Sequence, residues 1–109
     1  MAPLITDKLE EIVTACKAHC VQELFVFGSA VRDDFHKDSD IDFIADFTLQ
    51  RNTRDMRTIE RYYDNKDGLQ ERLSQLLNRD VDLLTESSIR NKYLFHFINQ
   101  EKQLLYAAA

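Results

Sequence analysis

Residues 28–42 read GSAVRDDFHKDSDID and connect two runs that have the character of β-strands. The preceding run, Glu23–Phe27, is short and nearly continuously apolar, which is typical of a buried strand that ends at a tight turn. In the following run, residues 41–47, hydrophobic side chains alternate with more polar ones, as they do along a strand with one buried face. The connection therefore begins at a glycine and ends in a pair of aspartates.

These aspartates, Asp40 and Asp42, are predicted to point to the same side of the second strand. Residues two apart on a strand share a face and lie about 6.6 Å apart along the chain. Asp82, between Val81 and Leu83, has the same flanking pattern in a predicted third strand. If the two strands are neighbours, three carboxylates share one face. Such carboxylates repel one another unless a cation neutralises them, and hard oxygen ligands suit magnesium.

Gly28 and Ser29 directly follow the first strand and are candidate nucleotide-binding residues. A glycine lets the backbone approach a phosphate closely, and Ser29 adds a hydroxyl donor. Arg32, three residues further on, is placed to bind a phosphate with two parallel hydrogen bonds. A phosphate cradle beside a magnesium site favours the transfer of a nucleotidyl group from a nucleoside triphosphate.

The remaining segments predict an α/β (α+β) chain: a small mixed β-sheet flanked by helices, in a single domain over residues 1–109. Helical spacing predicts a helix over Asp7–His19, with Asp7 as its cap, and a polar helix over 52–63. Residues 64–68 (DNKDG) are expected to break that helix before a further one that contains Leu69, Leu73, Leu76 and Leu77. Ser87 or Ser88 is expected to cap a helix that runs to about Gln100, before a short edge strand at 104–106.

Composition restricts the classes of function. The formal net charge is −5, which disfavours a nucleic acid as the main partner because such binders usually present a basic face. No apolar run approaches the roughly 20 residues of a membrane span, and the first residues lack the pattern of a signal peptide. A cytoplasmic protein without a membrane partner is expected.

The two cysteines, Cys16 and Cys20, are four residues apart with His19 between them. A zinc site needs further ligands, and the other histidines are distant in the sequence. A structural disulfide is not expected in the cytoplasm. Both cysteines are therefore predicted to be small apolar residues on the buried face of a helix.

Gly28-Ser29, ten intervening residues and Asp40-Ile41-Asp42 resemble the signature of the polymerase-beta-like nucleotidyltransferases. The subgroup that the chain resembles, from about Asp7 to Tyr106, is the minimal nucleotidyltransferase (MNT) antitoxins of HEPN toxins. The resemblance implies that metal ions are held by Asp40, Asp42 and Asp82, and that the nucleotide is bound by Gly28, Ser29 and Arg32. Two features depart from the family pattern: Asp33 replaces a frequent glycine, and residues 51–63 form an enlarged connection.

The function implied by the resemblance is a magnesium-dependent transfer of AMP from ATP, or of another NMP from its triphosphate, to a hydroxyl of a cognate HEPN toxin. A tyrosine is the expected acceptor, and the modification would make the protein an antitoxin. Three alternatives remain open: a binding module that neutralises its partner without catalysis, a transferase for a small molecule, and a scaffold protein without a ligand.

Several side chains have two interpretations. Arg32 could instead pair with Asp33 or Asp34 at the surface, and Ser39 could cap a turn or bind a ligand. The stripe Arg51, Arg54, Arg57 and Arg61 is either a solvated helix face or a docking surface for an acidic partner. His36 is expected to be a bystander. Tyr62, Tyr63 and the aromatic run 93–98 are expected to serve the core.

Overall fold

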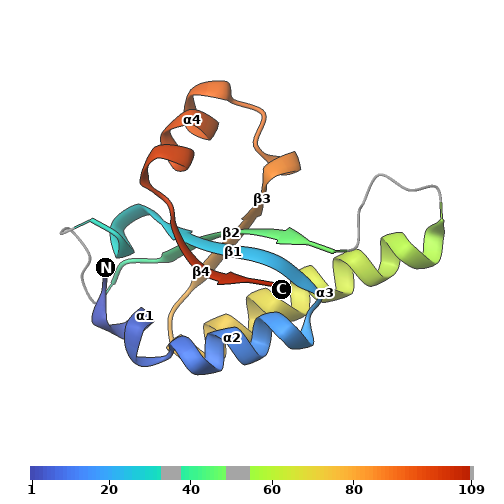
Figure 1. The fold of residues 1–109 in the computed structure, drawn as a ribbon, viewed down its shortest axis with the longest axis horizontal. Helices are drawn as coiled ribbons and strands as arrows, with labels where there is room; N and C mark the ends of the chain where they lie inside the picture. The colour runs from blue at the N-terminus through green and yellow to red at the C-terminus, as the bar shows by residue number, and fades with distance from the viewer. Residues whose placement is uncertain (33–37, 49–54, 109) are drawn as a thin grey trace.

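The computed structural model describes residues 1–32, 38–48 and 55–108, and its elements are shown in Figure 1. The helices are α1 (Pro3–Asp7), α2 (Leu9–Ala18), α3 (Met56–Leu77) and α4 (Lys92–Glu101), and the strands are β1 (Val21–Phe27), β2 (Ile41–Phe47), β3 (Val81–Thr85) and β4 (Gln103–Ala107). Two short 3-10 helices, η1 (Gly28–Ala30) and η2 (Glu86–Ser88), follow β1 and β3.

The strands form one sheet in the order β3-β2-β1-β4. Strand β1 pairs with β2 and with β4 in antiparallel fashion, whereas β2 and β3 are parallel. The predicted small mixed sheet flanked by helices is therefore confirmed, as is the edge position of the last strand. The adjacency of β2 and β3, on which the shared face of carboxylates depends, is also present.

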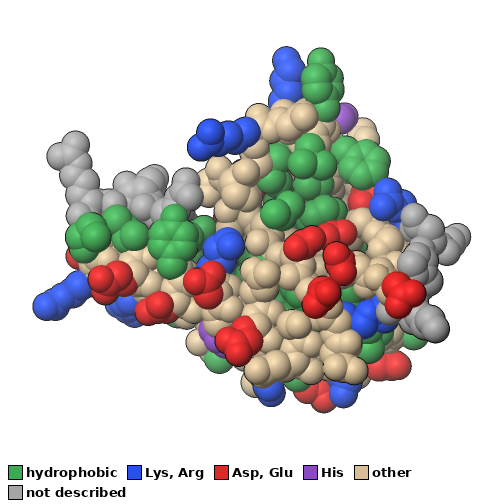
Figure 2. Space-filling model, turned by 180° about the vertical axis from the view of Figure 1, so that it is seen from behind, with side chains coloured by type: hydrophobic (Ala, Val, Ile, Leu, Met, Phe, Trp, Pro, Cys, Tyr) green, Lys and Arg blue, Asp and Glu red, His purple; other side chains and the backbone are tan. Residues whose placement is uncertain are grey.

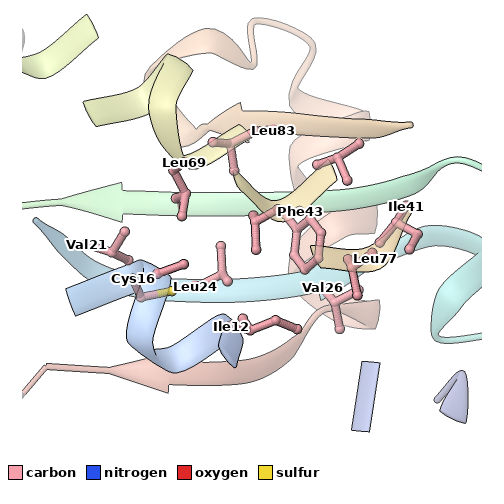
Figure 3. Close-up of a cluster of buried hydrophobic side chains, with 14 of the residues drawn as sticks. Ile12, Cys16, Val21, Leu24, Val26, Ile41, Phe43, Leu69, Leu77 and Leu83 are labelled. Carbon is pink, nitrogen blue, oxygen red and sulfur yellow. The ribbon is translucent and has the colours of Figure 1, made fainter. Parts of the chain in front are cut away.

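The two faces of the sheet are covered differently. Helices α2 and α3 pack on one face, where Ile12, Leu24, Phe43 and Leu69 belong to the main hydrophobic core (Figure 3). Helix α4 lies over the opposite face (Figure 1), where Phe27, Ile44 and Ile98 form a smaller cluster. Alternation along β2 sends Phe43 into the main core and Asp42 toward the α4 side.

The predicted helix over Asp7–His19 begins and ends differently in the structure. Asp7 is the last residue of α1, and α2 begins at Leu9 without a side-chain cap, so the predicted capping by Asp7 is wrong. The additional turn of α1 is stabilised by tertiary contacts that local spacing does not report. Ile5 is fully buried, and the backbone N–H of Ala2 donates to the carbonyl of Ala30 at 2.7 Å.

Helix α3 runs without interruption through residues 64–68, so the predicted break is wrong. Tyr62, Leu69, Leu73 and Leu77 are its buried residues, spaced at seven, four and four, and they therefore lie on one stripe of a continuous helix. One glycine in a helix costs about 1 kcal/mol, which burial of this stripe offsets. The helix begins after Asp55, whose side chain accepts a hydrogen bond from the Arg57 N–H.

The cap predicted for the last helix is also wrong. Ser88 closes η2 instead, since its hydroxyl donates to the Thr85 carbonyl at 2.7 Å. The cap of α4 is Asn91, whose side chain accepts from the N–H groups of Tyr93 and Leu94. Ser87 and Ser88 therefore belong to the 3-10 helix η2, which ends before α4 begins.

The burial of cysteines and aromatic residues was predicted in part. Cys16 is buried in α2, and burial raises the pKa of its thiol to about 12. Cys20 lies beyond α2 with φ 59° and is only half-buried, which corrects its prediction; both thiols are free.

Tyr62 joins the core as expected, but Tyr63 and much of the aromatic run 93–98 are exposed. Within the described ranges, no helix is long and apolar enough to cross a membrane.

Candidate active site

The turn after β1 is shaped by Gly28. Its φ of +77° lies in the left-handed region that glycine tolerates best. A Cβ atom at this position would lie 2.5 Å from Oδ2 of Asp42, because Phe27 and Asp42 are paired in the β1–β2 ladder. The glycine therefore allows the phosphate-turn candidate and the acidic strand to approach each other closely. Ser29 is the next residue of η1 and is half-buried.

Asp42 and Asp82 are direct partners in the parallel β2–β3 pairing. The pKa of Asp42 is raised to about 6, first by burial, then by the negative charges of Asp82 and Asp40 and by a hydrogen bond with the Asp82 side chain. The positive charge of Arg32 acts in the opposite direction. The structure thus brings the three predicted carboxylates into one electrostatic group, with Asp42 at its centre.

The chemistry of this group fits a divalent cation. Asp42 and Asp82 offer hard oxygen ligands in contact with each other, and their repulsion is the kind that a bound cation relieves. In the described part of the chain, no three acidic, histidine or cysteine side chains converge closely enough to enclose a metal ion. Asp40, exposed just before β2, contributes charge from a greater distance.

Glu101, the last residue of α4, belongs to this site although sequence reasoning missed it. Its Oε1 accepts a hydrogen bond of 2.6 Å from the Gly28 N–H, and its Oε2 lies 3.8 Å from Nη1 of Arg32. Glu101 is 73 positions from Gly28, so no local spacing connects the two residues. Its weak signal was an acidic residue at the predicted end of the last helix, near Gln100.

Arg32 has contacts that its surface interpretation did not foresee. It pairs with Glu101, and its guanidinium carbon lies 6.0 Å from the centre of the Phe97 ring. Asp33 and Asp34, the partners considered from the sequence, lie outside the described residues. Arg32 therefore lies between the acidic group and α4.

An open groove of about 780 Å³ lies between α3 and β3, and Asp42 and the Gly28 turn are not among the residues that line it. Its lining includes Asp40 and Asp82 together with Gln70 and Glu71. Figure 2 shows acidic side chains gathered at the level of the sheet, below hydrophobic side chains on the part of the surface that α4 forms.

The other candidates are less central. Ser39 is half-buried, and its carbonyl accepts a hydrogen bond of 2.9 Å from Arg79. Arg57 and Arg61 are exposed on α3, whereas Arg51, Arg54 and His36 lie outside the described residues.

Comparison with known proteins identifies the family to which the chain belongs. The model of the nucleotidyltransferase domain family matches residues 8–105. The protein adenylyltransferase MntA of Thermococcus cleftensis is 33% identical over 96 residues, which are 84% of this chain and 87% of that protein. A crystal structure of a toxin–antitoxin with AMP-PNP has a TM-score of 0.66 at 22% identity, covering 92% of this chain and 73% of that one. A complex of tri-AMPylated Shewanella oneidensis HEPN toxin with MNT antitoxin has a TM-score of 0.60 at 19% identity, covering 94% and 72%.

The chain therefore belongs to the nucleotidyltransferase domain family and is a nucleotidyltransferase. Within that family it is similar to MntA, as the resemblance of its Gly-Ser and Asp-x-Asp residues to the MNT antitoxins had indicated.

Proposed function

We propose that this protein transfers AMP from ATP to a tyrosine hydroxyl of a HEPN-family toxin, with magnesium as cofactor, and thereby acts as an antitoxin. The observation that carries the proposal is the close approach of the Gly28 turn to Asp42, which is itself paired with Asp82. This arrangement supports the proposal of a phosphate turn directly beside a metal site. The similarity to MntA, a protein adenylyltransferase, supports the nature of the transferred group.

Each carboxylate has a separate role in this proposal. Asp40 and Asp42 would hold a magnesium ion together with the triphosphate, and Asp82 would help to hold a second ion or accept the proton of the acceptor hydroxyl. Bound magnesium supplies charge neutralisation for the phosphate oxygens. The acceptor oxygen forms a bond with the α-phosphorus, the bond from that phosphorus to the bridging oxygen breaks, and pyrophosphate leaves.

Gly28, Ser29 and Arg32 bind the triphosphate. The Gly28 conformation keeps the turn close to Asp42, and the Ser29 hydroxyl and Arg32 guanidinium donate to phosphate oxygens. Arg32 is 48% exposed and therefore accessible to a ligand that enters from solvent. The solved toxin–antitoxin complex with AMP-PNP supports nucleotide binding in this fold.

A protein acceptor fits the surface of the domain. Tyr93, Leu94 and Phe97 are exposed on α4, and Phe97 adjoins Arg32. This apolar face is a docking candidate beside the site, in addition to the exposed Arg57 and Arg61 on α3.

The decisive experiment is co-expression with a candidate HEPN partner, followed by intact-mass analysis of that partner. We expect AMP-sized mass additions that disappear when the Asp42→Asn variant replaces the wild-type protein. Mapping of the modified peptide identifies the acceptor side chain. An unmodified partner in a stable complex would contradict catalysis.

The principal alternative is neutralisation by complex formation alone. A variant with both Asp40→Asn and Asp42→Asn separates the two functions, because it keeps the docking surfaces and changes the carboxylates. If this variant still neutralises the toxin fully, binding is sufficient. Equal labelling of small alcohols by labelled ATP would instead indicate a small-molecule transferase.

A further inference from the structure

We propose that Glu101 is a positioning residue for nucleotide binding: its carboxylate connects the Gly28 amide to the Arg32 guanidinium and holds the phosphate turn and its arginine together. The inference rests on the proposed function, since it concerns the same triphosphate site. It adds a residue from the far end of the chain to a site otherwise built from the Gly-Ser turn and three aspartates.

The two oxygens of Glu101 have different partners. Oε1 accepts from the Gly28 N–H at 2.6 Å, and Oε2 faces Nη1 of Arg32 at 3.8 Å. The Glu101 side chain is only 13% exposed, so both interactions are partly shielded from water. Hydrogen bonds to a charged acceptor are stronger than those between neutral groups. The hydrogen bond to Gly28 is therefore the firmer contact, and the longer ion pair orients the arginine.

Gly28 needs a contact that holds its amide because a glycine backbone can adopt many conformations. Glycine loses more conformational freedom on ordering than other residues, so a glycine turn is held only by its contacts. The Gly28 carbonyl already accepts from the N–H groups of Val31 and Arg32, at 3.0 and 3.2 Å. Glu101 holds the amide on the other side of the same residue. With both sides fixed, the turn keeps the geometry that a phosphate must meet.

Arg32 is supported by the same helix. Phe97 and Glu101 are four residues apart and therefore share one face of α4. The guanidinium lies 6.0 Å from the Phe97 ring centre, within the range of a cation–π contact, and opposite the Glu101 carboxylate. Both contacts thus help to keep the arginine near the phosphate turn before a nucleotide arrives.

The first test examines the connection in the nucleotide-free protein. Gly28 is one of two glycines, so its amide resonance is readily assigned in a protein labelled with ¹⁵N-glycine. We expect Glu101→Ala to shift this resonance strongly and Glu101→Gln to shift it less, because an amide oxygen still accepts the hydrogen bond. Gln100→Ala, an exposed neighbour on α4, is the matched control and should leave the resonance in place. An unchanged Gly28 resonance in Glu101→Ala would contradict the connection.

The second test measures ATP binding in magnesium by calorimetry, with thermal unfolding as the check of folding. Loss of a hydrogen bond to a charged group predicts that Glu101→Ala weakens ATP binding by about tenfold to a hundredfold. Glu101→Gln should fall between wild type and Glu101→Ala. In an Arg32→Ala background, the effect of Glu101→Gln should be smaller, since the charge of Glu101 acts through that arginine.

The outcomes distinguish this inference from the function on which it rests. If wild type binds ATP and folded Glu101→Ala binds it equally or more tightly, the positioning role is wrong while the proposed function stands. If wild type binds no ATP, the proposed function and the role of Glu101 in it both fail. Additive effects of Glu101→Gln and Arg32→Ala would contradict the action through Arg32.

Discussion

Gly28 and Asp42 approach each other so closely that a side chain at position 28 has no room. A Cβ atom at position 28 would lie 2.5 Å from the Asp42 carboxylate, and the substituted residue would have to keep a positive backbone φ. We expect Gly28→Ala to abolish transfer and to lower the free energy of unfolding by about 1–3 kcal/mol, the cost of a strained backbone. Transfer assays and denaturant unfolding measure the two effects.

Gly68→Ala is the matched control for this variant. Gly68 lies within α3, where an added Cβ would lie 3.0 Å from His19 Nε2, a side-chain atom that can shift. The gain in helix propensity is about 1 kcal/mol and opposes the cost of that contact. Transfer by Gly68→Ala should equal that of wild type. Equal activity of Gly28→Ala would show that the close approach to Asp42 is not required.

The raised pKa of Asp42 makes stability depend on pH in metal-free buffer. Its pKa is about 6 in the folded protein against 3.8 for an ordinary aspartate, so the folded state binds the proton more tightly than the unfolded state. The free energy of unfolding should therefore fall as the pH rises from about 4 to about 6 and remain low above it. Asp42→Asn should remove this decline.

Thermal midpoints of wild type and Asp42→Asn, measured from pH 4 to 8 with a chelator, check the sign. We expect the variant to gain stability relative to wild type as the pH rises. Added magnesium should raise the wild-type midpoint at pH 8 more than that of the variant, because a cation bound only by the folded protein stabilises it. A constant difference between the two proteins at all pH values would contradict the shift.

The residues of the site were predictable to the extent that their signals are local. Alternation along a strand identified Asp42 and Asp82, since both have apolar neighbours that face the core, and Asp40 two residues before Asp42. The turn glycine was visible because it ends an apolar run. Glu101 was not, because its contacts arise only when α4 crosses the sheet and brings its last residue to the turn. Its role, like those of the other site residues, remains a prediction.

Among the helices, α3 shows why residues that favour turns can mislead a prediction of where a helix ends. Residues 64–68 contain two aspartates, an asparagine and a glycine, which favour turns in isolation. The buried stripe from Tyr62 to Leu77 keeps one helical register across them, and burial of that stripe determines the outcome. The helix ends instead at Asn78, in the left-handed conformation with φ 51°.

Asn78 provides a test of that helix end. Residues other than glycine and asparagine are strained in this conformation, by about 1–2 kcal/mol. We expect Asn78→Ala to lower the free energy of unfolding by about that amount and Asn78→Gly to leave it equal or higher. Chemical denaturation of the three proteins measures this. A stability of Asn78→Ala equal to that of Asn78→Gly would show that the left-handed conformation is not maintained.

In the whole molecule, the sheet separates the main hydrophobic core, on the face covered by α2 and α3, from a smaller cluster on the face covered by α4. Helix α3 contributes Leu69, Leu73 and Leu77 to the main core, whereas α4 contributes Ile98 to a small cluster with Phe27 and Ile44. Asp42 shares the face of β2 on which Ile44 packs in the smaller cluster. The centre of the candidate site thus lies beside the smaller of the two hydrophobic clusters.

This asymmetry predicts that the layers open independently. Amide hydrogens of α4 should exchange through local opening, whereas those of residues 69–77 should require global unfolding. Hydrogen exchange followed by mass spectrometry should show faster exchange in Lys92–Glu101. Ile98→Ala should accelerate exchange in α4 and change residues 69–77 much less. ATP with magnesium should slow exchange in α4, because Glu101 and Phe97 adjoin the arginine proposed to bind the triphosphate. Equal protection of the amides of α3 and α4 would instead show that the sheet and both helical layers unfold as one unit. A partner bound to α4 would then stabilise the whole domain rather than α4 alone.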